Sequence, residues 1–354
     1  MNFLKKFKLG NRTISKTTSP ILVAEISANH NGSIQNAKKL ILEAKKNGAD
    51  FVKLQTYEAD TMTFKTNKED FIIKHGLWKG QSLWNLYDKA KTPFSWQKSL
   101  FLYAKKVGVQ CFSTPFDSNA VDLLEKIKCP FYKISSFENQ DLDLIKRIAK
   151  TKKPIIISTG LTKISDLDKS IKTIHKYGNK KLIILYCVSS YPASFKDFNI
   201  KTINEIEKRY KCLVGLSDHC NNNIIGVSAV NHGAKLFEKH FALKNQLKGF
   251  DVEFSKKGPD LLKYKQDLLN AWTINQSNLN ISSKEDKNIK FKRSIYSSKS
   301  IKKGEVFSKN NLRCVRPGFG INPVYLNKVI GKRSKRTIPE FTAIKKSMIS
   351  GFKF

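Results

Sequence analysis

The chain has few acidic residues and no long apolar run. Its 354 residues include 65 Lys and Arg but 29 Asp and Glu, which gives a formal net charge of +36. No apolar stretch reaches the roughly 18 residues that a membrane-spanning helix needs. The basic start of the chain also lacks an apolar core of signal-peptide length. We therefore expect neither a membrane span nor export by a signal peptide, and the cytoplasm is the expected compartment.

Cysteine is scarce and its spacing is irregular. The six cysteines stand at positions 111, 129, 187, 212, 220 and 314, and none of them forms a CxxC pair. Several lie inside apolar runs that are expected to form strands. This spacing predicts reduced, mostly buried thiols in a reducing compartment rather than a disulfide framework.

The positive charge alone would indicate nucleic acid or an anionic membrane surface as a partner. However, the basic residues are nearly all Lys, they are spread along the whole chain, and Asn and Ile are also abundant. Recognition of bases favours Arg interleaved with aromatic residues, which is not the pattern here. We interpret the charge as a solvated surface with the composition of AT-rich coding, so neither nucleic acid nor membrane is expected as a partner.

What the chain does contain is a repeated alternation of strand-like and helix-like segments. Short apolar runs end in a polar or charged residue, and segments of helical periodicity separate them. The expected strands are Ile21–Ser27, Asp50–Gln55, Val109–Ser113, Phe131–Ile134, Pro154–Ser158, Lys181–Cys187, Leu213–Ser217 and Leu236–His240. This order predicts a (β/α)8 barrel over residues 20–274, in which the carboxyl ends of all strands meet on one face. The polar residues that close the runs are the first site candidates: Glu25, Lys53, Gln55, Ser158, Ser217, His219 and His240.

The regions outside the regular alternation suggest additional parts. The segment from Thr56 to Gly108 is longer than a usual crossover, and residues 68–78, with His75 and Trp78, are predicted to form a substrate-facing lid or simply to cover the barrel rim. Residues 275–290 read as a linker, and residues 291–354, with short alternating runs and Gly turns, predict a small β-rich domain. The pattern assigns no role to an N-terminal extension over residues 1–19.

Two histidines at neighbouring strand ends suggest a metal site. His219 and His240 close or directly follow the last two strands, which lie about 5 Å apart in such a sheet. Their imidazoles could bind one metal ion, although each could instead be a core or rim histidine satisfied by hydrogen bonds. Because no Cys or His stands at a third equivalent strand end, an open divalent site fits better than a closed structural zinc site.

Two lysines suggest a bound anion. Lys53 and Lys133 follow the second and fourth strands in similar surroundings, and inward-facing lysines at a barrel mouth need an anion unless they extend to solvent. Hydroxyl groups could support a phosphate or carboxylate there: Thr114, Ser136, Ser158 and Ser217. Glu25 and Glu138 could orient water, move a proton or pair with a lysine. These residues predict chemistry on a phosphorylated ligand without selecting one reaction.

Seven motifs in order resemble the sialic acid synthase family: AEISANHNGS, ADFVKLQTY, STPFD, YKISS, STG, GLSDH and EKHF. The tail from Arg293, with VRPGFGI, is similar to the antifreeze-like (SAF) domain of that family. EDFIIKHGLW and AKTPFSW are most similar to the branch that makes pseudaminic acid. Val188 stands where the family generally has Thr, and the segment around Asp251 is unusual, so the departures concern substrate contacts rather than the reaction.

The resemblance implies a TIM barrel with a SAF domain and a PEP-dependent synthase activity. Phosphoenolpyruvate (PEP) would condense with an amino-sugar aldehyde, 2,4-diacetamido-2,4,6-trideoxy-L-altrose, to a nine-carbon 2-keto acid used in cell-surface glycans such as those of flagellin. Mn²⁺ or Mg²⁺ would be held by His219 and His240, and Glu25 would position water or handle the proton. PEP would be bound by Lys53, Thr114, Lys133, Ser136, Ser158 and Ser217. The sugar, or the surroundings of the metal ion, would be contacted by Gln55, Tyr191 and Asp251.

The resemblance also implies a domain-swapped homodimer. Arg316 of one subunit would reach the acyl-amino group of the sugar in the other, unless it caps a turn in its own domain. Two alternatives to a synthase that uses this altrose derivative remain. One is a sister N-acetylneuraminate or legionaminate synthase, and the other is a non-catalytic barrel that binds polyanions in a salt-dependent way and tolerates mutation of His219.

Overall fold

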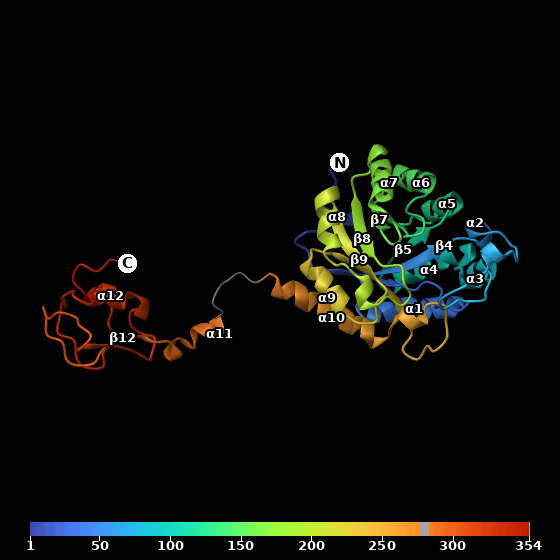
Figure 1. Cartoon of the computed structure of the whole chain (residues 1–354). Helices are drawn as coiled ribbons and strands as arrows, with labels where there is room; N and C mark the ends of the chain where they lie inside the picture. Colours follow the sequence, from blue (N-terminus) through green and yellow to red (C-terminus); the bar gives the residue numbers. More distant parts are fainter. Residues whose placement is uncertain (277–282, 354) are drawn as a thin grey trace. The chain divides into compact units, whose positions relative to one another are not determined.

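A closed parallel barrel forms the larger part of the molecule (Figure 1). The computed structural model describes residues 1–276 and 283–353. The chain divides into two units, Met1–Gln276 and Ser277–Phe354, each with its own hydrophobic core. The predicted linker at 275–290 falls partly on residues 277–282, which lie outside the described residues. None of the described helices is both long enough and apolar enough to cross a membrane.

All the predicted barrel strands are confirmed. They are β3 (Ile21–Glu25), β4 (Phe51–Thr56), β5 (Gln110–Pro115), β6 (Tyr132–Ile134), β7 (Ile155–Ser158), β8 (Leu182–Cys187), β9 (Leu213–Asp218) and β10 (Leu236–Ala242). The sheet closes because β10 pairs in parallel with both β9 and β3. The first strand ends earlier than predicted, since Ser27 has φ +43° and turns the chain out of the sheet.

The register of the strands sets which residues share a level. Glu25 on β3 is aligned with both Lys53 on β4 and His240 on β10. Glu238, two residues before His240, is aligned with Ser217 on β9. Since side chains aligned in parallel neighbours point to the same face, these five residues stack in two levels near the carboxyl ends of their strands.

Amphipathic helices cover the outside of the barrel. The helices are α1 (Ile34–Lys46), α4 (Phe94–Lys106), α5 (Ser118–Lys126), α6 (Leu142–Lys150), α7 (Ile164–Lys176), α8 (Thr202–Tyr210), α9 (Ile224–Asn231) and α10 (Pro259–Ile274). In α1, Ser33 caps the first turn by accepting from Asn36 N–H, and Leu40 and Ile41 are buried. The helix ends before Gly48, whose φ of +84° suits glycine, as the Asn-Gly pair predicts.

The long segment between β4 and α4 contains the predicted excursion. It comprises α2 (Ala59–Met62), a 3-10 turn η1 (Glu69–Phe71), and α3 (Leu83–Ala90). Ile72 and Ser82 form an isolated antiparallel bridge that closes the loop between η1 and α3. The Ser82 side chain also accepts from Asn85 N–H and so starts α3.

The N-terminal extension, to which the sequence pattern gave no role, is a hairpin that packs on the amino ends of the barrel strands. Strands β1 (Lys6–Leu9) and β2 (Arg12–Ser15) pair antiparallel, and Phe7, Leu9 and Ile14 are buried in the barrel core. Gly10 at the turn has φ +57°, and a Cβ there would lie 1.8 Å from Gln110 Oε1, so glycine is required. The hairpin therefore closes the end of the barrel opposite to the predicted site.

The smaller unit has little regular strand. The strands β12 (Ser294–Ser297) and β13 (Leu312–Val315) pair antiparallel, and isolated bridges such as Ile301 to Ile338 extend the β structure. Its short helical elements are α11 (Ser283–Asp286), η4 (Ile289–Phe291), η5 (Pro323–Tyr325), α12 (Leu326–Val329) and η6 (Lys346–Met348). Buried residues including Ile295, Phe307 and Ile344 form its separate core.

Candidate active site at the carboxyl ends of the barrel strands

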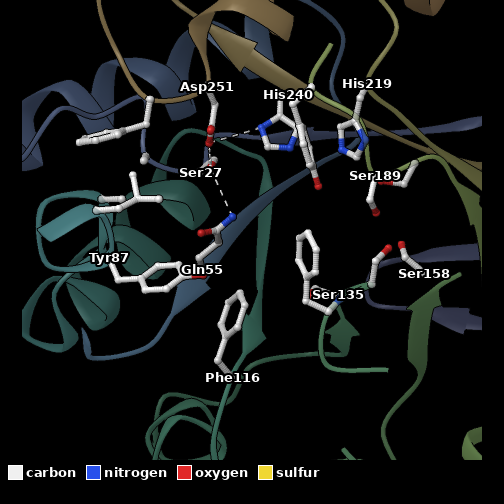
Figure 2. A pocket seen from close by; sticks show the side chains of 18 of the residues that line it. Ser27, Gln55, Tyr87, Phe116, Ser135, Ser158, Ser189, His219, His240 and Asp251 are labelled. Atoms are coloured by element: carbon white, nitrogen blue, oxygen red, sulfur yellow. Dashed lines mark hydrogen bonds and ion pairs between the residues drawn. The ribbon is translucent and has the colours of Figure 1, made fainter. Parts of the chain in front are cut away.

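A cavity of about 470 Å³ opens among the loops that follow the barrel strands. Its floor is polar, and most of the predicted site residues line it. They are Lys53, Gln55, Lys133, Ser136, Glu138, Ser158, Tyr191, Ser217, His219, His240 and Asp251. Figure 2 shows part of this lining, with His219, Ser189, Ser158 and Ser135 across the cavity from Ser27 and Gln55. The chain thus brings together residues that are up to about 200 positions apart, as a barrel mouth does.

A buried cluster of opposite charges forms the floor. Lys53 Nζ lies 2.6 Å from Glu25 Oε2 and 2.9 Å from Glu238 Oε1, and Lys133 Nζ lies 3.6 Å from the same Glu238 oxygen. Burial lowers the pKa of Lys53 to about 8, although Glu238 opposes the shift. Burial raises the pKa of Glu238, but Lys133 and Lys53 outweigh it and hold that pKa below its ordinary value.

Glu238 is the main residue that the sequence reasoning missed. The lysines were expected to need an external anion, whereas in the structure Glu238 lies between them. A signal was present, because Glu238 is an acidic residue inside an apolar strand and stands two positions before His240, so both side chains face the same way. With two ammonium groups and two carboxylates, the cluster is formally neutral before any ligand binds.

Hydroxyl groups near the lysines differ in how they are bonded. Ser158 Oγ is buried, and no described group hydrogen-bonds to it. Ser217 Oγ lies 3.5 Å from Glu238 Oε1, and Ser136 Oγ accepts from Gly160 N–H at 3.1 Å. Thr114 does not line the cavity. Its Oγ1 accepts a hydrogen bond from Lys53 Nζ at 3.3 Å. The free hydroxyl of Ser158 suits an anionic oxygen next to the lysines, whereas the Ser217 hydroxyl donates to Glu238 and would have to turn to reach such a ligand.

The two histidines meet at the cavity wall, with ring centroids 5.4 Å apart. His219 Nδ1 lies 2.9 Å from Val188 O, so this nitrogen donates. Burial lowers the pKa of His219, but Cys187 and Val188 O outweigh it and raise that pKa, so Nε2 offers a lone pair to a metal ion once the ring is deprotonated. His240 Nδ1 is buried without a hydrogen-bond partner in the described chain, and it lies 3.7 Å from Asp251 Oδ2. Burial and nearby positive charges hold the pKa of His240 well below its ordinary value, which keeps that imidazole neutral.

These histidines fit a divalent metal ion. A metal-binding imidazole is neutral and commonly uses its other N–H on a backbone carbonyl, which is the arrangement of His219 and Val188. An unpartnered buried nitrogen, as in His240, is a second fitting feature. Within residues 1–276 and 283–353, no group of three or more His, Cys, Asp or Glu side chains is placed to hold a metal. The set therefore provides two imidazoles and leaves other positions to water or substrate.

The expectation that no cysteine stands at an equivalent strand end was wrong. Cys187 is the last residue of β8, lines the cavity, and lies against His219. Burial raises the pKa of this thiol, but the charges of His219 and Lys133 lower it to about 7. It was missed because an apolar strand accounts for a buried cysteine without further chemistry. As predicted, the cysteines are free thiols, and five of them are buried.

The two candidate acids have different positions. Glu25 is fully buried, accepts from Ser27 N–H at 2.6 Å and pairs with Lys53, and it is not among the residues that line the cavity. Glu138 lines the cavity and accepts a hydrogen bond from Ser135 Oγ. Burial raises the pKa of Glu138, against the effect of Ser135 and Lys133. Of the two, Glu138 is the acid that can reach a ligand in the cavity.

A series of side-chain hydrogen bonds lies across the cavity from Ser158 and Ser189. Gln55 Nε2 donates to Ser27 Oγ at 3.2 Å, and Ser27 Oγ donates to Asp251, which faces His240 (Figure 2). Tyr191 packs with its ring centroid 4.5 Å from that of His219. Ser27, which connects Gln55 to Asp251, was not predicted from the sequence, because a serine at the end of a strand carries no specific signal.

The predicted lid residues contribute an apolar wall. Ile73, His75 and Trp78 line the cavity together with further apolar residues of the excursion: Met62, Leu83, Leu86 and Ala90. Trp78 Nε1 donates to Phe250 O at 3.2 Å and so connects the excursion to the loop after β10. The excursion therefore faces the cavity rather than only the outside of the rim. Arg316 belongs to the smaller unit, where its side chain is exposed.

Comparison with known proteins agrees with this geometry. The NeuB family model matches residues 40–279, and the SAF domain model matches residues 292–350. The chain belongs to the NeuB family. Its resemblance to sialic acid synthases, inferred from seven motifs, is thus confirmed, as is the order of barrel and SAF domain.

NeuB-family relatives match almost the whole chain. A pseudaminic acid synthase from Campylobacter jejuni subsp. jejuni serotype O:23/36 is 39% identical, covering 96% of this chain and 99% of the relative. An N,N'-diacetyllegionaminic acid synthase from Campylobacter jejuni subsp. jejuni serotype O:2 is 34% identical, covering 90% and 97%. The crystal structure of an N-acetylneuraminic acid synthetase from Leptospira borgpetersenii, in complex with citrate, has a TM-score of 0.72 at 27% identity, covering 82% and 97%.

Proposed function

We propose that this NeuB-family protein is a pseudaminic acid synthase. The proposed reaction joins PEP, 2,4-diacetamido-2,4,6-trideoxy-L-altrose and water to give pseudaminic acid and phosphate. The observation that carries the proposal is the cavity at the strand ends, where two lysines, several serine hydroxyls and two imidazoles converge. The similarity to a pseudaminic acid synthase over nearly the whole chain supports the choice of product.

PEP is proposed to bind above the charged floor. Its phosphate and carboxylate would be held by Lys53 and Lys133 with the hydroxyls of Ser136, Ser158 and Ser217. Glu238 lies between the lysines in the ligand-free protein, so binding of PEP requires the lysines to exchange part of this pairing for the ligand. Thr114 supports the reaction by holding the Lys53 ammonium group from behind.

His219 and His240 are proposed to hold Mn²⁺ or Mg²⁺. When bound, such an ion polarises the aldehyde carbonyl of the sugar as a Lewis acid. The chain fixes the two imidazoles through Val188 O and through the strand register of β9 and β10. Asp251 faces His240 and would orient either that imidazole or a sugar hydroxyl.

The bond changes follow from the two substrates. The methylene carbon of PEP attacks the aldehyde carbon, which forms the new C–C bond and leaves a cation-like centre at C2. The aldehyde oxygen takes up a proton and becomes a hydroxyl group. Water adds to C2 and gives up one proton, and the C–O bond to phosphate then breaks as the new C2 hydroxyl passes its proton to the departing phosphate and becomes the ketone of the 2-keto acid. We assign the handling of the water proton to Glu138, which lines the cavity. Glu25, the sequence-based candidate, is proposed to act through Lys53, with which it is paired.

The apolar wall suits the proposed sugar. The altrose derivative carries a deoxygenated C6 methyl group and two acetamido methyl groups, which need apolar surroundings. Ile73, Leu83 and Leu86 of the excursion supply them, and Gln55 and Tyr191 supply polar contacts. A sister legionaminate or N-acetylneuraminate synthase is the alternative within the family. A non-catalytic polyanion-binding barrel is the alternative from another class.

A domain-swapped homodimer is proposed to complete the site. Exposed apolar side chains stand in the loops after several barrel strands: Phe64, Phe137, Leu161, Phe195 and Leu247. Exposed apolar side chains around one end of the barrel favour coverage by another protein surface. We propose that the SAF domain of a second copy covers these side chains and that its Arg316 binds the sugar's acyl-amino oxygen.

We also propose the cytoplasm, where PEP is available, as the site of action.

A substrate panel tests this function. Purified protein is incubated with PEP, Mn²⁺ and, separately, the altrose derivative, N-acetylmannosamine and the legionaminic acid precursor, and phosphate release and product mass are measured. Turnover with the altrose derivative is expected. Turnover with another sugar would retain the synthase reaction and refute the specificity. Absence of turnover in all three, with metal present and the dimer intact, would favour the non-catalytic alternative.

A further inference from the structure

A buried lysine on the outer face of β10 contacts the loop that carries His219. Along β10 the side chains alternate, so Glu238 and His240 line the cavity while Lys239 does not. Lys239 is fully buried, and its Nζ lies 3.0 Å from Asp218 O. The same Nζ donates to Cys220 O and lies 3.4 Å from Asp218 Oδ2. Lys239 therefore binds the two backbone carbonyls on either side of His219.

Asp218 completes this network. Its Oδ1 accepts from Cys220 N–H at 2.8 Å, and its Oδ2 accepts from Tyr264 O–H at 2.9 Å. Tyr264 is fully buried on α10 and packs closely on Gly226 of α9, where a Cβ would come within 2.4 Å of the tyrosine oxygen. The turn after β9 is thus fixed by side chains from β10 and α10 as well as by its own backbone.

We infer that Lys239 is a positioning residue that sets the separation of the His219 and His240 imidazoles. Lys239 on β10 donates to the carbonyls of residues 218 and 220 and so holds the backbone on both sides of His219, directly after β9. His240 is the next residue after Lys239 on β10. One side chain thereby connects the backbones of both proposed metal ligands. This inference rests on the proposed function insofar as the two imidazoles hold a metal ion.

The burial of charge supports a role beyond general stability. A buried ion pair on an apolar surface is often no more stabilising than a hydrophobic pair of similar volume, because both charges lose their hydration. Lys239 nonetheless occupies a fully buried position on β10, where it contacts Asp218 at the end of β9 and the ring of Tyr264 on α10. What the lysine supplies and an apolar residue does not is a set of directed bonds to the backbone around His219.

The experiment compares two matched double variants. Lys239→Met with Asp218→Asn removes both charges, while the asparagine oxygen and the shape of the site are kept. The control is Lys265→Met with Asp50→Asn at the other end of the barrel, where Lys265 Nζ binds Asp50 and the carbonyl of Pro20. Each pair consists of a lysine, an aspartate and at least one backbone carbonyl, and the side chains of Lys265 and Asp50 are 13% and 7% exposed. Neither lysine lines the cavity.

The main readout is Mn²⁺ affinity without substrate, measured from the electron paramagnetic resonance signal of free Mn²⁺. Loss of residues that orient metal ligands weakens metal binding by about 10- to 100-fold, so we expect this range for the Lys239 double variant and no change for the control. We also expect phosphate release by the Lys239 variant to need more Mn²⁺ for half-maximal rate and to recover most of the wild-type rate at saturating Mn²⁺.

Unchanged Mn²⁺ affinity in the Lys239 variant, or equal weakening in the control, would overturn the inference. A wild-type protein that binds no Mn²⁺ would overturn it as well. If the wild type binds Mn²⁺ but turns over none of the sugars, the proposed reaction fails while the weakened metal binding of the Lys239 variant still supports the positioning role. The melting temperature of each variant, measured in parallel, shows whether it is folded.

Discussion

The two ends of the barrel both bury charged side chains, but they differ in how those side chains are paired. At the amino end, Asp50 has both oxygens engaged, with Arg12 at 2.7 Å on one side and with Lys265 and Leu22 N–H on the other. At the carboxyl end, Ser158 Oγ, Glu238 Oε2 and His240 Nδ1 are buried and lack a hydrogen-bond partner in the part of the chain that the structure describes.

This difference separates stability from function. A buried polar atom without a partner is unfavourable, so it persists where a ligand or solvent can complete it. The paired charges at the amino end fix the hairpin and α10 onto the barrel, whereas Ser158, Glu238 and His240, which carry the unpaired atoms, line the cavity. Substitutions at the two ends should therefore affect different measurements, and the following predictions use that contrast.

The largest effect is expected at the histidine pair. His219→Ala should reduce phosphate release at saturating Mn²⁺ by about a thousandfold, or roughly 4 kcal/mol of transition-state stabilisation, because a metal ligand is lost. His232→Ala is the control, since His232 Nδ1 also bonds a backbone carbonyl, Ser228 O at 3.0 Å, but lies away from the cavity. Similar rates for both variants would contradict the assignment of the metal site.

A change at the amino end should lower stability instead. Lys265→Met removes one of the two charged partners of Asp50, which keeps its contacts with Arg12 and Leu22 N–H, so a destabilisation of about 2 to 3 kcal/mol is expected from the lost charged hydrogen bond. The melting temperature should fall, while the rate of phosphate release at 25 °C stays at the wild-type value. Adding Asp50→Asn should recover part of the stability. A reduced rate at an unchanged melting temperature would mean that the two ends are not independent.

A paired histidine at the carboxyl end refines the comparison. His30 Nδ1 accepts a hydrogen bond from Gly32 N–H, and His30 Nε2 lies 3.1 Å from Thr92 Oγ1. Burial lowers the pKa of His30 from 6.5 to about 4. As the pH falls below 6.5, the unfolded chain binds this proton before the native protein does. Stability should therefore decrease by about 2 kcal/mol between pH 7 and 5 from this group.

The variant His30→Gln checks the source of that pH dependence. Denaturant unfolding of both proteins at a series of pH values between 7 and 5 gives the slope of stability against pH. The slope should be smaller in the variant, because one buried group no longer changes its protonation on unfolding. Equal slopes would assign the acid sensitivity to other groups.

The smallest effect is expected at Ser158. Ser158→Ala removes a hydroxyl that makes no protein hydrogen bond, so the melting temperature should stay within about 2 °C, the shift that about 0.5 kcal/mol produces. The KM for PEP should rise about tenfold, the effect of one lost hydrogen bond to an anion. Ser170→Ala, at a buried serine bonded to Asn139 O, should show the reverse, with lower stability and an unchanged KM.

The sequence predicted the barrel well because each strand combined an apolar run with a polar end. That pattern predicts both the fold and the cavity face, and Lys53, His219 and His240 line the cavity as expected. It did not reveal which polar residues pair with one another. Glu238 was missed for this reason, and Glu25, a residue of the right type at the right strand end, lies behind Lys53 instead of in the cavity.

The hairpin at the start of the chain was missed for a different reason. The sequence pattern assigns no role to residues 1–19, but Lys6–Leu9 alternates exposed lysines with buried apolar residues. That alternation is the signature of a half-buried strand, and Gly10 between two such runs marks the turn. The pairing of the hairpin with the barrel end depends on contacts with Gln110 and Phe131 that no local pattern contains.

The most direct test of the proposed synthase reaction is the fate of the phosphate oxygens. Turnover of PEP with the altrose derivative and Mn²⁺ is carried out in water enriched in oxygen-18, and the released phosphate is analysed by mass spectrometry. If water adds at C2 and the C–O bond breaks, the phosphate carries no oxygen-18. Phosphate labelled with oxygen-18 would mean that water attacks phosphorus, and this would contradict the proposed synthase reaction.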